Sequence, residues 1–466
     1  MPNRPNVILL MADQWRGDCL GCLGHPDVKT PFLDSLAARG TLFTRAYSST
    51  PTCIAARAAL FTGLKPEHHG RVGYRDGIRW DYPVTLAGEF TRAGYQTECV
   101  GKMHVHPPRA SMGFQHVLLH DGYLHYYRRA DTPYIWQQHT ADDYYYEMAG
   151  KGHRDPTDTG LECNSHPVRP WIYDEESHPT NWVARNAVDF LRRRDRDKPF
   201  FLMASFVRPH PPYDAPAYYL DRYLSGPLTL PKAGAWAPPY EAETANSVSG
   251  ISDPVLMREA LAGYYACMTH IDHQISRILQ AVEAEGLFEN TIIAFVSDHG
   301  EMMGDHHYMR KSLPYEGSAR VPFILAGPGI PKGRNEKAVE MMDVMPTLLT
   351  AAGLSVPDCA DGEDAFADTG RELIFGEHCY GRLSNHYIVS ARDKYIWFSQ
   401  TGEEQYFDLS ADPGELRNAA GDAAYAQRVA YLRAEMVRHL TGRAEGYTDG
   451  ERLIPGKPPC DLIQST

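Results

Sequence analysis

Residues 49–63 read STPTCIAARAALFTG, and the rest of the chain is organised around this stretch. Residues 50–52 interrupt regular structure, whereas those from 54 onward are strong helix formers up to Gly63, a residue typical of a helix C-terminus. Cys53 is therefore predicted to lie at the start of a short helix, where unpaired backbone N–H groups and the helix dipole attract an anion. Arg57 follows one turn later on the same face. The stretch predicts a place to hold a tetrahedral oxyanion, although a buried structural cysteine beside an arginine would have the same pattern.

Length and composition set limits on fold and function. A chain of 466 residues suggests one large domain with a smaller one appended. The formal net charge of -13 argues against general nucleic-acid binding, so local cations or a metal would have to hold an anionic substrate. There is no apolar run of about 18 residues, so no membrane span is expected. The N-terminus lacks the pattern of a secretory signal, and the nine scattered cysteines suit reduced thiols; both favour a cytoplasmic location.

Polar residues that could bind a metal follow two buried strands. A strand is expected at 96–100, and apolar runs predict buried strands at 7–12, 199–206 and 291–296. Asp13 and Gln14 follow the first of these strands, and Asp298 and His299 follow the last. Ligands gather beyond the carboxyl ends of parallel strands, so these four side chains are expected around one cation. Carboxylate and amide oxygens suit calcium, and an imidazole moves the preference toward manganese.

Cations and imidazoles follow the other strands. Lys102 and His104 come directly after the strand at 96–100, and His210 stands between prolines after the strand at 199–206. Lys102 could neutralise an anionic oxygen, and the two histidines could move protons or hydrogen-bond the substrate. Taken singly, each could equally be an ordinary loop residue.

Together these motifs resemble the signatures of the sulfatase family. The stretch at Cys53 resembles Cys-x-Pro/Ala-x-Arg followed by Leu-x-Thr-Gly, residues 101–104 resemble Gly-Lys-x-His, and residues 297–300 resemble Ser-Asp-His/Asn-Gly. Further matches include the Lys-x-x-x-Tyr-Glu segment that begins at Lys311. The resemblance covers nearly the whole chain in the family's order, which a chance match to one motif would not do.

The resemblance implies a specific mechanism. In that family the cysteine is converted to formylglycine, so Cys53 would be the precursor of the nucleophile and the substrate of a maturation enzyme. One hydroxyl of the hydrated aldehyde would attack sulfur, and loss of a proton from the other would expel sulfate. The implied metal ligands are Asp13, Gln14, Cys53, Asp298 and His299. The implied catalytic residues are Cys53, Arg57, Lys102, His104, His210 and Lys311.

The resemblance also implies the fold. We expect an α/β architecture like that of alkaline phosphatase, with a large mixed, mostly parallel sheet flanked by helices and a small C-terminal antiparallel sheet with a helix. The catalytic domain is predicted at 1–370 and the smaller α+β subdomain and tail at 371–466. Residues 105–180 are predicted to form an aromatic-rich, irregular excursion over the active site. Its rings could stack on a sugar or aryl group, or simply pack a loop-rich layer.

Three functions remain open from the sequence. The first is a sulfatase that hydrolyses an aryl or sugar sulfate monoester with one divalent metal, calcium being expected and manganese the alternative. The second is a phosphonate monoester or phosphodiester hydrolase using the same site. Gln14 and His299 favour it, since sulfatases carry an acidic residue at the position of Gln14. The third is a catalytically silent binding protein, which predicts damage to the nucleophile or metal set, and the sequence has none. A homo-oligomer is possible, and no nucleic-acid or membrane partner is expected.

Overall fold

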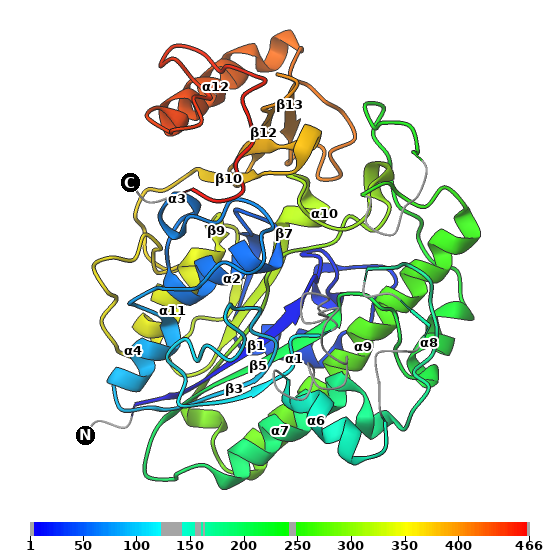
Figure 1. The fold of residues 1–466 in the computed structure, drawn as a ribbon, viewed down its shortest axis with the longest axis vertical. Coiled ribbons are helices and arrows are strands. Elements are labelled where there is room, and N and C mark those ends of the chain that lie inside the picture. Colours follow the sequence, from blue (N-terminus) through cyan, green and yellow to red (C-terminus); the bar gives the residue numbers. More distant parts are fainter. Residues whose placement is uncertain (1–3, 123–141, 154–159, 162–163, 242–247, 464–466) are drawn as a thin grey trace.

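A nine-stranded sheet forms the centre of the protein, here described by a computed structural model over residues 4–122, 142–153, 160–161, 164–241 and 248–463 (Figure 1). The strand order is β4-β3-β5-β1-β6-β7-β2-β8, and β9 pairs with β2. The strands are β1 (Asn6–Asp13), β2 (Thr41–Tyr47), β3 (Gln96–Gly101), β4 (His116–Leu119), β5 (Phe200–Pro209), β6 (Thr291–Ser297), β7 (Arg320–Ala326), β8 (Gly333–Asn335) and β9 (Val339–Glu340). Strand β7 runs antiparallel to its neighbours, β6 and β2, whereas the other pairs are parallel, which confirms a mixed, mostly parallel sheet.

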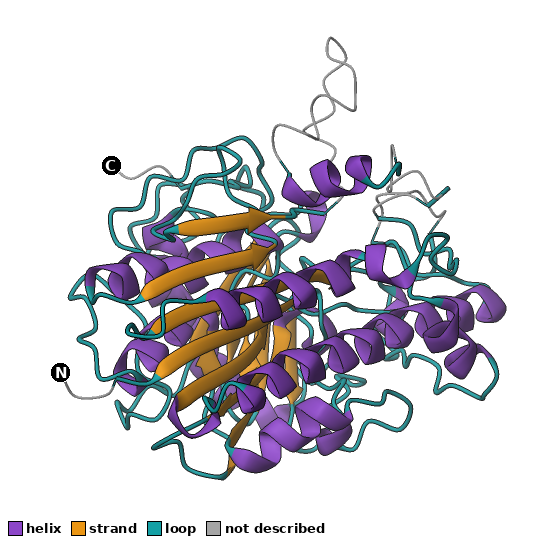
Figure 2. Ribbon diagram, turned by 90° about the horizontal axis from the view of Figure 1, so that it is seen from below, coloured by secondary structure: helices purple, strands orange, loops and turns teal. Residues whose placement is uncertain are grey.

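The central strands are buried on both faces, as their continuous apolar sequence predicts. Along β1, Ile8 and Leu10 belong to one hydrophobic core, whereas Leu9 and Met11 belong to the core on the opposite face. The first core contains helices α1 (Pro31–Arg39), α7 (Pro179–Arg193) and α9 (Pro254–Ala284), and the second contains α2 (Cys53–Thr62), α4 (Leu86–Arg92) and α11 (Val344–Ala351). Figure 2 shows helices on both sides of the sheet.

The longest helix illustrates how the sequence sets an element's bounds. Helix α9 begins with Pro254 after Asp253, whose carboxylate accepts a hydrogen bond from the backbone N–H of Val255 at 2.8 Å. The helix ends shortly before Gly286, which has a left-handed φ of 66°. The predicted helix at 254–286 is therefore confirmed to within two residues. None of the described helices combines the length and the apolar character that crossing a lipid bilayer requires.

A separate four-stranded antiparallel sheet follows in the C-terminal part (Figure 1, top). Its strands are β10 (Ile374–His378), β11 (Asn385–Val389), β12 (Asp393–Phe398) and β13 (Glu404–Asp408). Helix α12 (Ala426–Leu440) packs on one face of this sheet. The other face contacts Leu313 and Tyr315, which lie in the segment directly before α10 (Glu316–Ala319). The second sheet thus packs directly against segments that lead to the central sheet.

The region at 105–180 is less irregular than predicted, because its described part includes β4 and helix α6 (Asp143–Gly150). Tyr144, Tyr145 and Trp171 are buried, and the two tyrosines pack against Trp182 and His120. Packing, rather than stacking on a ligand, therefore accounts for these three rings. Five other aromatic residues of the predicted excursion lie outside the described residues: Tyr123, Tyr126, Tyr127, Tyr134 and Trp136.

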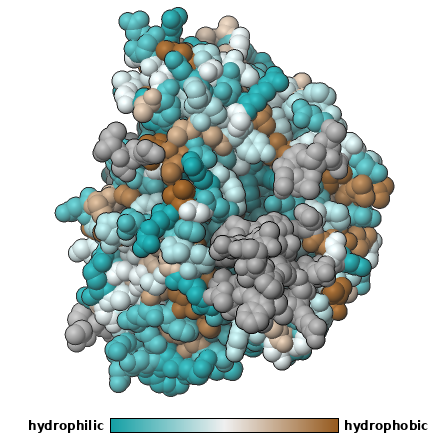
Figure 3. All heavy atoms as spheres, viewed as in Figure 1, coloured by the Kyte–Doolittle hydropathy of each residue, from teal (hydrophilic) through white to brown (hydrophobic). Residues whose placement is uncertain are grey.

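The surface is mixed in character. In the face drawn in Figure 3, hydrophilic residues predominate and hydrophobic residues form small separate groups. Two further α-helices of the described residues are α3 (Pro66–His69) and α8 (Ala217–Leu224).

Candidate active site

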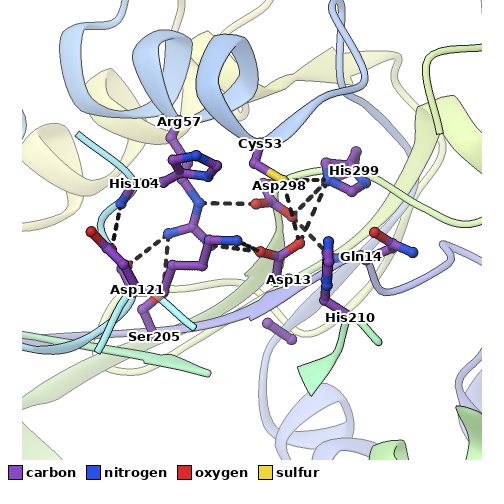
Figure 4. A network of polar contacts seen from close by, with 12 residues as sticks. Asp13, Gln14, Cys53, Arg57, His104, Asp121, Ser205, His210, Asp298 and His299 are labelled. Carbon is purple, nitrogen blue, oxygen red and sulfur yellow. Dashed lines mark hydrogen bonds and ion pairs between the residues drawn. The ribbon is translucent and has the colours of Figure 1, made fainter. Parts of the chain in front are cut away.

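Four donor side chains converge where two parallel strands end (Figure 4). Strands β1 and β6 pair so that Ala12 lies opposite Ser297, and the residues that follow therefore emerge at one edge of the sheet. One ligand atom from each of Asp13, Cys53, Asp298 and His299 lies within 4.8 Å of the others, and all four residues are buried. The predicted convergence of Asp13, Asp298 and residue 53 is thus present in the structure.

Cys53 is the first residue of helix α2, as expected. Its Sγ lies 3.2 Å from Nε2 of His299, 3.7 Å from a carboxylate oxygen of Asp13 and 3.5 Å from Nζ of Lys311. The turn before the helix is held by a backbone hydrogen bond of 3.0 Å from Ser312 to Pro51. That bond ties the segment carrying Lys311 to the segment carrying Cys53.

Arg57 is completely buried one turn further along α2. Its Nε donates to Asp298 at 2.9 Å, and Nη1 donates to the carbonyl of Lys102 at 2.7 Å and to Oγ of Ser205 at 3.1 Å. Nη2 lies 3.9 Å from a carboxylate oxygen of Asp13 and has no hydrogen-bond partner among the described residues. The guanidinium therefore holds the carboxylate of Asp298 and lies close to that of Asp13, and its Nη2 group makes no hydrogen bond to a described residue.

Two lysines contact the polar residues at the end of β1. The ammonium of Lys102 hydrogen-bonds Asp13, and Nζ of Lys311 lies 2.6 Å from Oε1 of Gln14. Burial alone would raise the pKa of Asp13. The positive charges around it outweigh burial and hold that pKa well below the ordinary value; in order of effect they are Lys102, His210, Lys311 and His299. The carboxylate of Asp13 is therefore charged and able to bind a cation.

The same positive charges act on Cys53. Burial and the nearby Asp13 would raise the pKa of the thiol, but Lys102, Lys311 and His299 lower it well below its ordinary value. Residue 53 thus lies in a pocket that favours negative charge on its side chain.

The two predicted catalytic histidines are held by their own loops. His104 has a left-handed φ of 55°, its backbone N–H donates to Asp121 at 2.8 Å, and its Nε2 lies 3.3 Å from Asp76. Burial and Lys102 would lower the pKa of His104, but its contacts with Asp76 and Cys53 raise it overall. This imidazole therefore tends toward the protonated form.

His210 has the opposite tendency. Its backbone N–H donates to the carbonyl of Asp13 at 3.2 Å, and its Nδ1 lies 2.8 Å from the carbonyl of Pro211. Burial, together with the charge of Lys311, lowers its pKa well below the ordinary value. In the neutral ring Nδ1–H donates to Pro211, so Nε2 is left as a proton acceptor.

The site also contains residues that sequence reasoning missed. Ser205 lies within a predicted strand, and Glu301 follows the recognised Ser-Asp-His-Gly motif, but neither had a signal of its own. Asp76 and Asp121 lie in loops without any recognisable pattern. Their positions depend on how distant loops pack, and only the structure supplies that information.

The donor set fits a divalent cation. Asp13 and Asp298 provide carboxylate oxygens, Gln14 an amide oxygen and His299 an imidazole nitrogen, and all four side chains are buried. Such a mixture of oxygen donors with one imidazole suits calcium or manganese. Arg57 and Lys102 offset part of the negative charge of the two buried carboxylates, and a divalent cation would add further positive charge.

Comparison with known proteins agrees with this geometry. The sulfatase family profile matches residues 5–354, and the profile described as N-sulphoglucosamine sulphohydrolase, C-terminal, matches residues 304–441. An arylsulfatase of Clostridium perfringens is 49% identical, covering 98% of this chain and 99% of the relative. An ulvan-active sulfatase of Formosa agariphila is 32% identical, covering 90% of this chain and 78% of the relative.

Solved structures with the same fold include a phosphonate monoester hydrolase of Agrobacterium radiobacter, with a TM-score of 0.76 and 27% identity over 98% of this chain and 100% of that chain. A structure described as bound to its substrate D-glucosamine-2-N,6-O-disulfate has a TM-score of 0.73 and 19% identity, covering 94% of this chain and 97% of that chain. The second likeness supports the fold alone.

This chain belongs to the sulfatase family. Its fold is that of the alkaline-phosphatase-like sulfatases, and it is a sulfuric ester hydrolase.

Proposed function

We propose that this protein hydrolyses an aryl or sugar sulfate monoester, using a nucleophile derived from Cys53 and one divalent cation. The observation that carries the proposal is the convergence of Asp13, Cys53, Asp298 and His299 within 4.8 Å at the start of helix α2. The names of two relatives, an arylsulfatase and an ulvan-active sulfatase, support the two substrate classes.

The proposed nucleophile is a hydrated formylglycine at position 53. Once a maturation enzyme has oxidised Cys53, the hydrate would supply a hydroxyl group that attacks the sulfur of the ester. His299 lies 3.2 Å from Sγ and Lys311 lies 3.5 Å away, so both could hydrogen-bond the oxygens that replace the sulfur. The lowered pKa of the present thiol supports a pocket that stabilises negative charge on this side chain.

The proposed metal ligands are the side chains of Asp13, Gln14, Asp298 and His299, together with residue 53. When bound, a divalent cation would polarise the ester oxygens and lower the cost of charge on the nucleophile. Calcium is the proposed ion because oxygen donors predominate, and manganese is the alternative because of the imidazole.

The remaining residues are proposed to neutralise charge and move protons. Lys102 and Lys311 flank the cluster and would stabilise the sulfuryl oxygens as charge develops on them. Arg57 would hold Asp13 and Asp298 in place. His104, whose pKa is raised, suits proton donation, whereas neutral His210 presents Nε2 as an acceptor until a bound anion raises its pKa.

Mass spectrometry tests the nucleophile directly. The tryptic peptide 46–57 contains Cys53 and ends at Arg57. From a host that contains a formylglycine-generating enzyme, we expect this peptide to lose the mass difference between a thiol and an aldehyde. Cys53→Ala should fold normally and lose sulfate ester hydrolysis, whereas Cys267→Ala, which changes a buried cysteine of α9, should retain it. An active Cys53→Ala enzyme would refute the proposal.

A second candidate function is hydrolysis of phosphonate monoesters or phosphodiesters at the same site. Gln14 favours it, and so does the likeness to a phosphonate monoester hydrolase at 27% identity. The two candidates are separated by kcat/KM on a matched aryl sulfate and aryl phosphonate monoester. We expect the sulfate to be the better substrate, and the reverse order would establish the alternative.

A further inference from the structure

Glu301 is a completely buried carboxylate beside the cluster, and none of the roles described above uses it. It follows Gly300, two residues after His299, and its side chain reaches back toward the end of β1. Both of its oxygens are engaged. Oε2 accepts a hydrogen bond from Nε2 of Gln14, and Oε1 accepts from the backbone N–H groups of Met303, at 3.0 Å, and Arg310.

The first of these contacts determines how the Gln14 amide is oriented. The carboxylate of Glu301 accepts from the amide nitrogen of Gln14, so the amide oxygen must face the other way. The oxygen does so, and it accepts from Nζ of Lys311 at 2.6 Å. Without an acceptor at position 301, the amide could turn over and present its N–H₂ group, which cannot bind a cation.

The backbone of Gln14 is held as firmly as its side chain. Its φ of 69° is a left-handed value that glutamine rarely adopts. Its N–H donates to Asp298 at 3.1 Å, and its carbonyl accepts from the hydroxyl of Tyr264 at 2.6 Å. Rotation of the terminal amide is therefore the main freedom left to this residue, and Glu301 removes it.

The other carboxylate oxygen of Glu301, Oε1, holds the loop that carries Lys311. The backbone N–H of Arg310, adjacent to Lys311, donates to Oε1 of Glu301. One carboxylate thus holds Gln14 and the residue next to Lys311, on the two sides of a contact that joins positions 297 apart in the sequence.

We propose that Glu301 is a positioning residue that orients the Gln14 amide oxygen toward the metal site and anchors the loop bearing Lys311. The inference rests on the proposed metal site. It assigns a reason for the pairing of an amide at position 14 with a carboxylate at position 301, since a carboxylate at both positions would place like charges in contact.

A reciprocal swap tests the proposal. The variants are Glu301→Gln, Gln14→Glu and the double variant, and the measurement is the Kd for Ca²⁺ and for Mn²⁺, by calorimetry on metal-free protein. We expect Glu301→Gln to bind either ion about 10- to 100-fold more weakly, the usual cost of losing a partner of a metal ligand. In the double variant the amide now at position 301 can donate to the carboxylate now at position 14. We therefore expect the double variant to bind at least about tenfold more tightly than Gln14→Glu.

Charge counting predicts a different order. Gln14→Glu carries one more negative charge than either the wild type or the double variant, so simple attraction would make it the tightest binder. A Kd for Gln14→Glu equal to or below that of the double variant overturns the proposal, and so does an unchanged Kd in Glu301→Gln. The comparison between Gln14→Glu and the double variant stands even where Glu301→Gln alone does not fold.

A matched control separates positioning from general loss of a buried carboxylate. Glu377→Gln removes a buried carboxylate that pairs with Arg443 in the C-terminal part, and it should leave both Kd values unchanged. Failure of the wild type to bind any divalent cation would instead refute the proposed metal site, which distinguishes the two failures.

Discussion

The ammonium of Lys311 lies 2.6 Å from the amide oxygen of Gln14 and 3.5 Å from the sulfur of Cys53. It therefore stands between a proposed metal ligand and the proposed nucleophile, where a sulfuryl oxygen would arrive. Both neighbours are buried, whereas Lys311 is partly exposed. Lys311 is therefore placed to neutralise negative charge on a substrate that enters the cluster from solvent.

Lys311→Met should lower kcat/KM for an aryl sulfate by roughly 10²- to 10³-fold, the range observed when one preorganised donor is removed from a developing anion. Stability should change little because the side chain is partly exposed. The control is Lys332→Met, which alters an exposed lysine after β7. Unchanged kcat/KM in Lys311→Met would remove this residue from the proposed machinery.

The buried pair of Arg57 and Asp298 predicts a metal-dependent stability effect. Arg57→Met leaves two buried carboxylates without the guanidinium, so the free energy of unfolding of the metal-free protein should fall by about 3–5 kcal/mol. The control is Arg208→Met, which breaks a comparable buried pair with Asp214. A bound divalent cation would restore positive charge beside Asp13 and Asp298, so Ca²⁺ should raise the free energy of unfolding of Arg57→Met more than that of Arg208→Met. Urea denaturation with and without the ion measures both. Equal effects of the ion on the two variants would contradict the expected coupling.

Much of this fold could be predicted because the strands are continuous apolar runs. The run at 7–12 lies within β1, and that at 291–296 lies within β6; a strand buried on both faces has this signature. The ends of such strands carry the polar residues, so Asp13, Asp298 and His299 could be placed together from the sequence. Helix bounds could also be predicted where proline and glycine mark them, as for α9.

What could not be predicted depends on side-chain direction and loop packing. The sequence placed Arg57 on the face of Cys53, but only the structure reveals that it donates to Asp298 behind the cluster. Glu301 directly follows the Ser-Asp-His-Gly motif, yet its contact with the Gln14 amide depends on the left-handed turn at Gln14. Buried Tyr144 could not be distinguished from a ligand-stacking residue, because composition alone does not specify burial.

Metal removal should reversibly inactivate the enzyme. After exhaustive chelation we expect loss of aryl sulfate hydrolysis and a lower Tm, because ion binding stabilises only the folded state. Asp298→Asn should weaken Ca²⁺ binding by at least about tenfold, since the ion loses a charged ligand, whereas Asp221→Asn, at an exposed position of α8, should not. Restoration by Ca²⁺ and by Mn²⁺ would then be compared at matched concentrations. Full activity in chelated, metal-free protein would exclude a required cation.

The last prediction concerns pH and a histidine outside the proposed machinery. His378, at the end of β10, is 1% exposed, and neither ring nitrogen makes a hydrogen bond of normal geometry to a described residue. Burial lowers its pKa to about 3, a contact with the backbone of Cys379 opposes that shift in part, and the charges of His299 and Lys311 add smaller downward contributions. The unfolded chain binds a proton at this residue near pH 6.5. Its contribution to stability is therefore complete above pH 6.5 and is lost as the pH falls toward 3.

His378→Phe removes this titration without removing a normal hydrogen bond. At pH 8 the two proteins differ only by packing, which calibrates the comparison. At pH 5 the wild type should have lost about 2 kcal/mol that the variant does not lose, since each pH unit between the two pKa values costs about 1.4 kcal/mol. The free energy of unfolding of the variant relative to wild type should thus rise by this amount between pH 8 and pH 5, as measured by urea denaturation. A difference that is constant across that range would mean that His378 has an ordinary pKa in the folded protein.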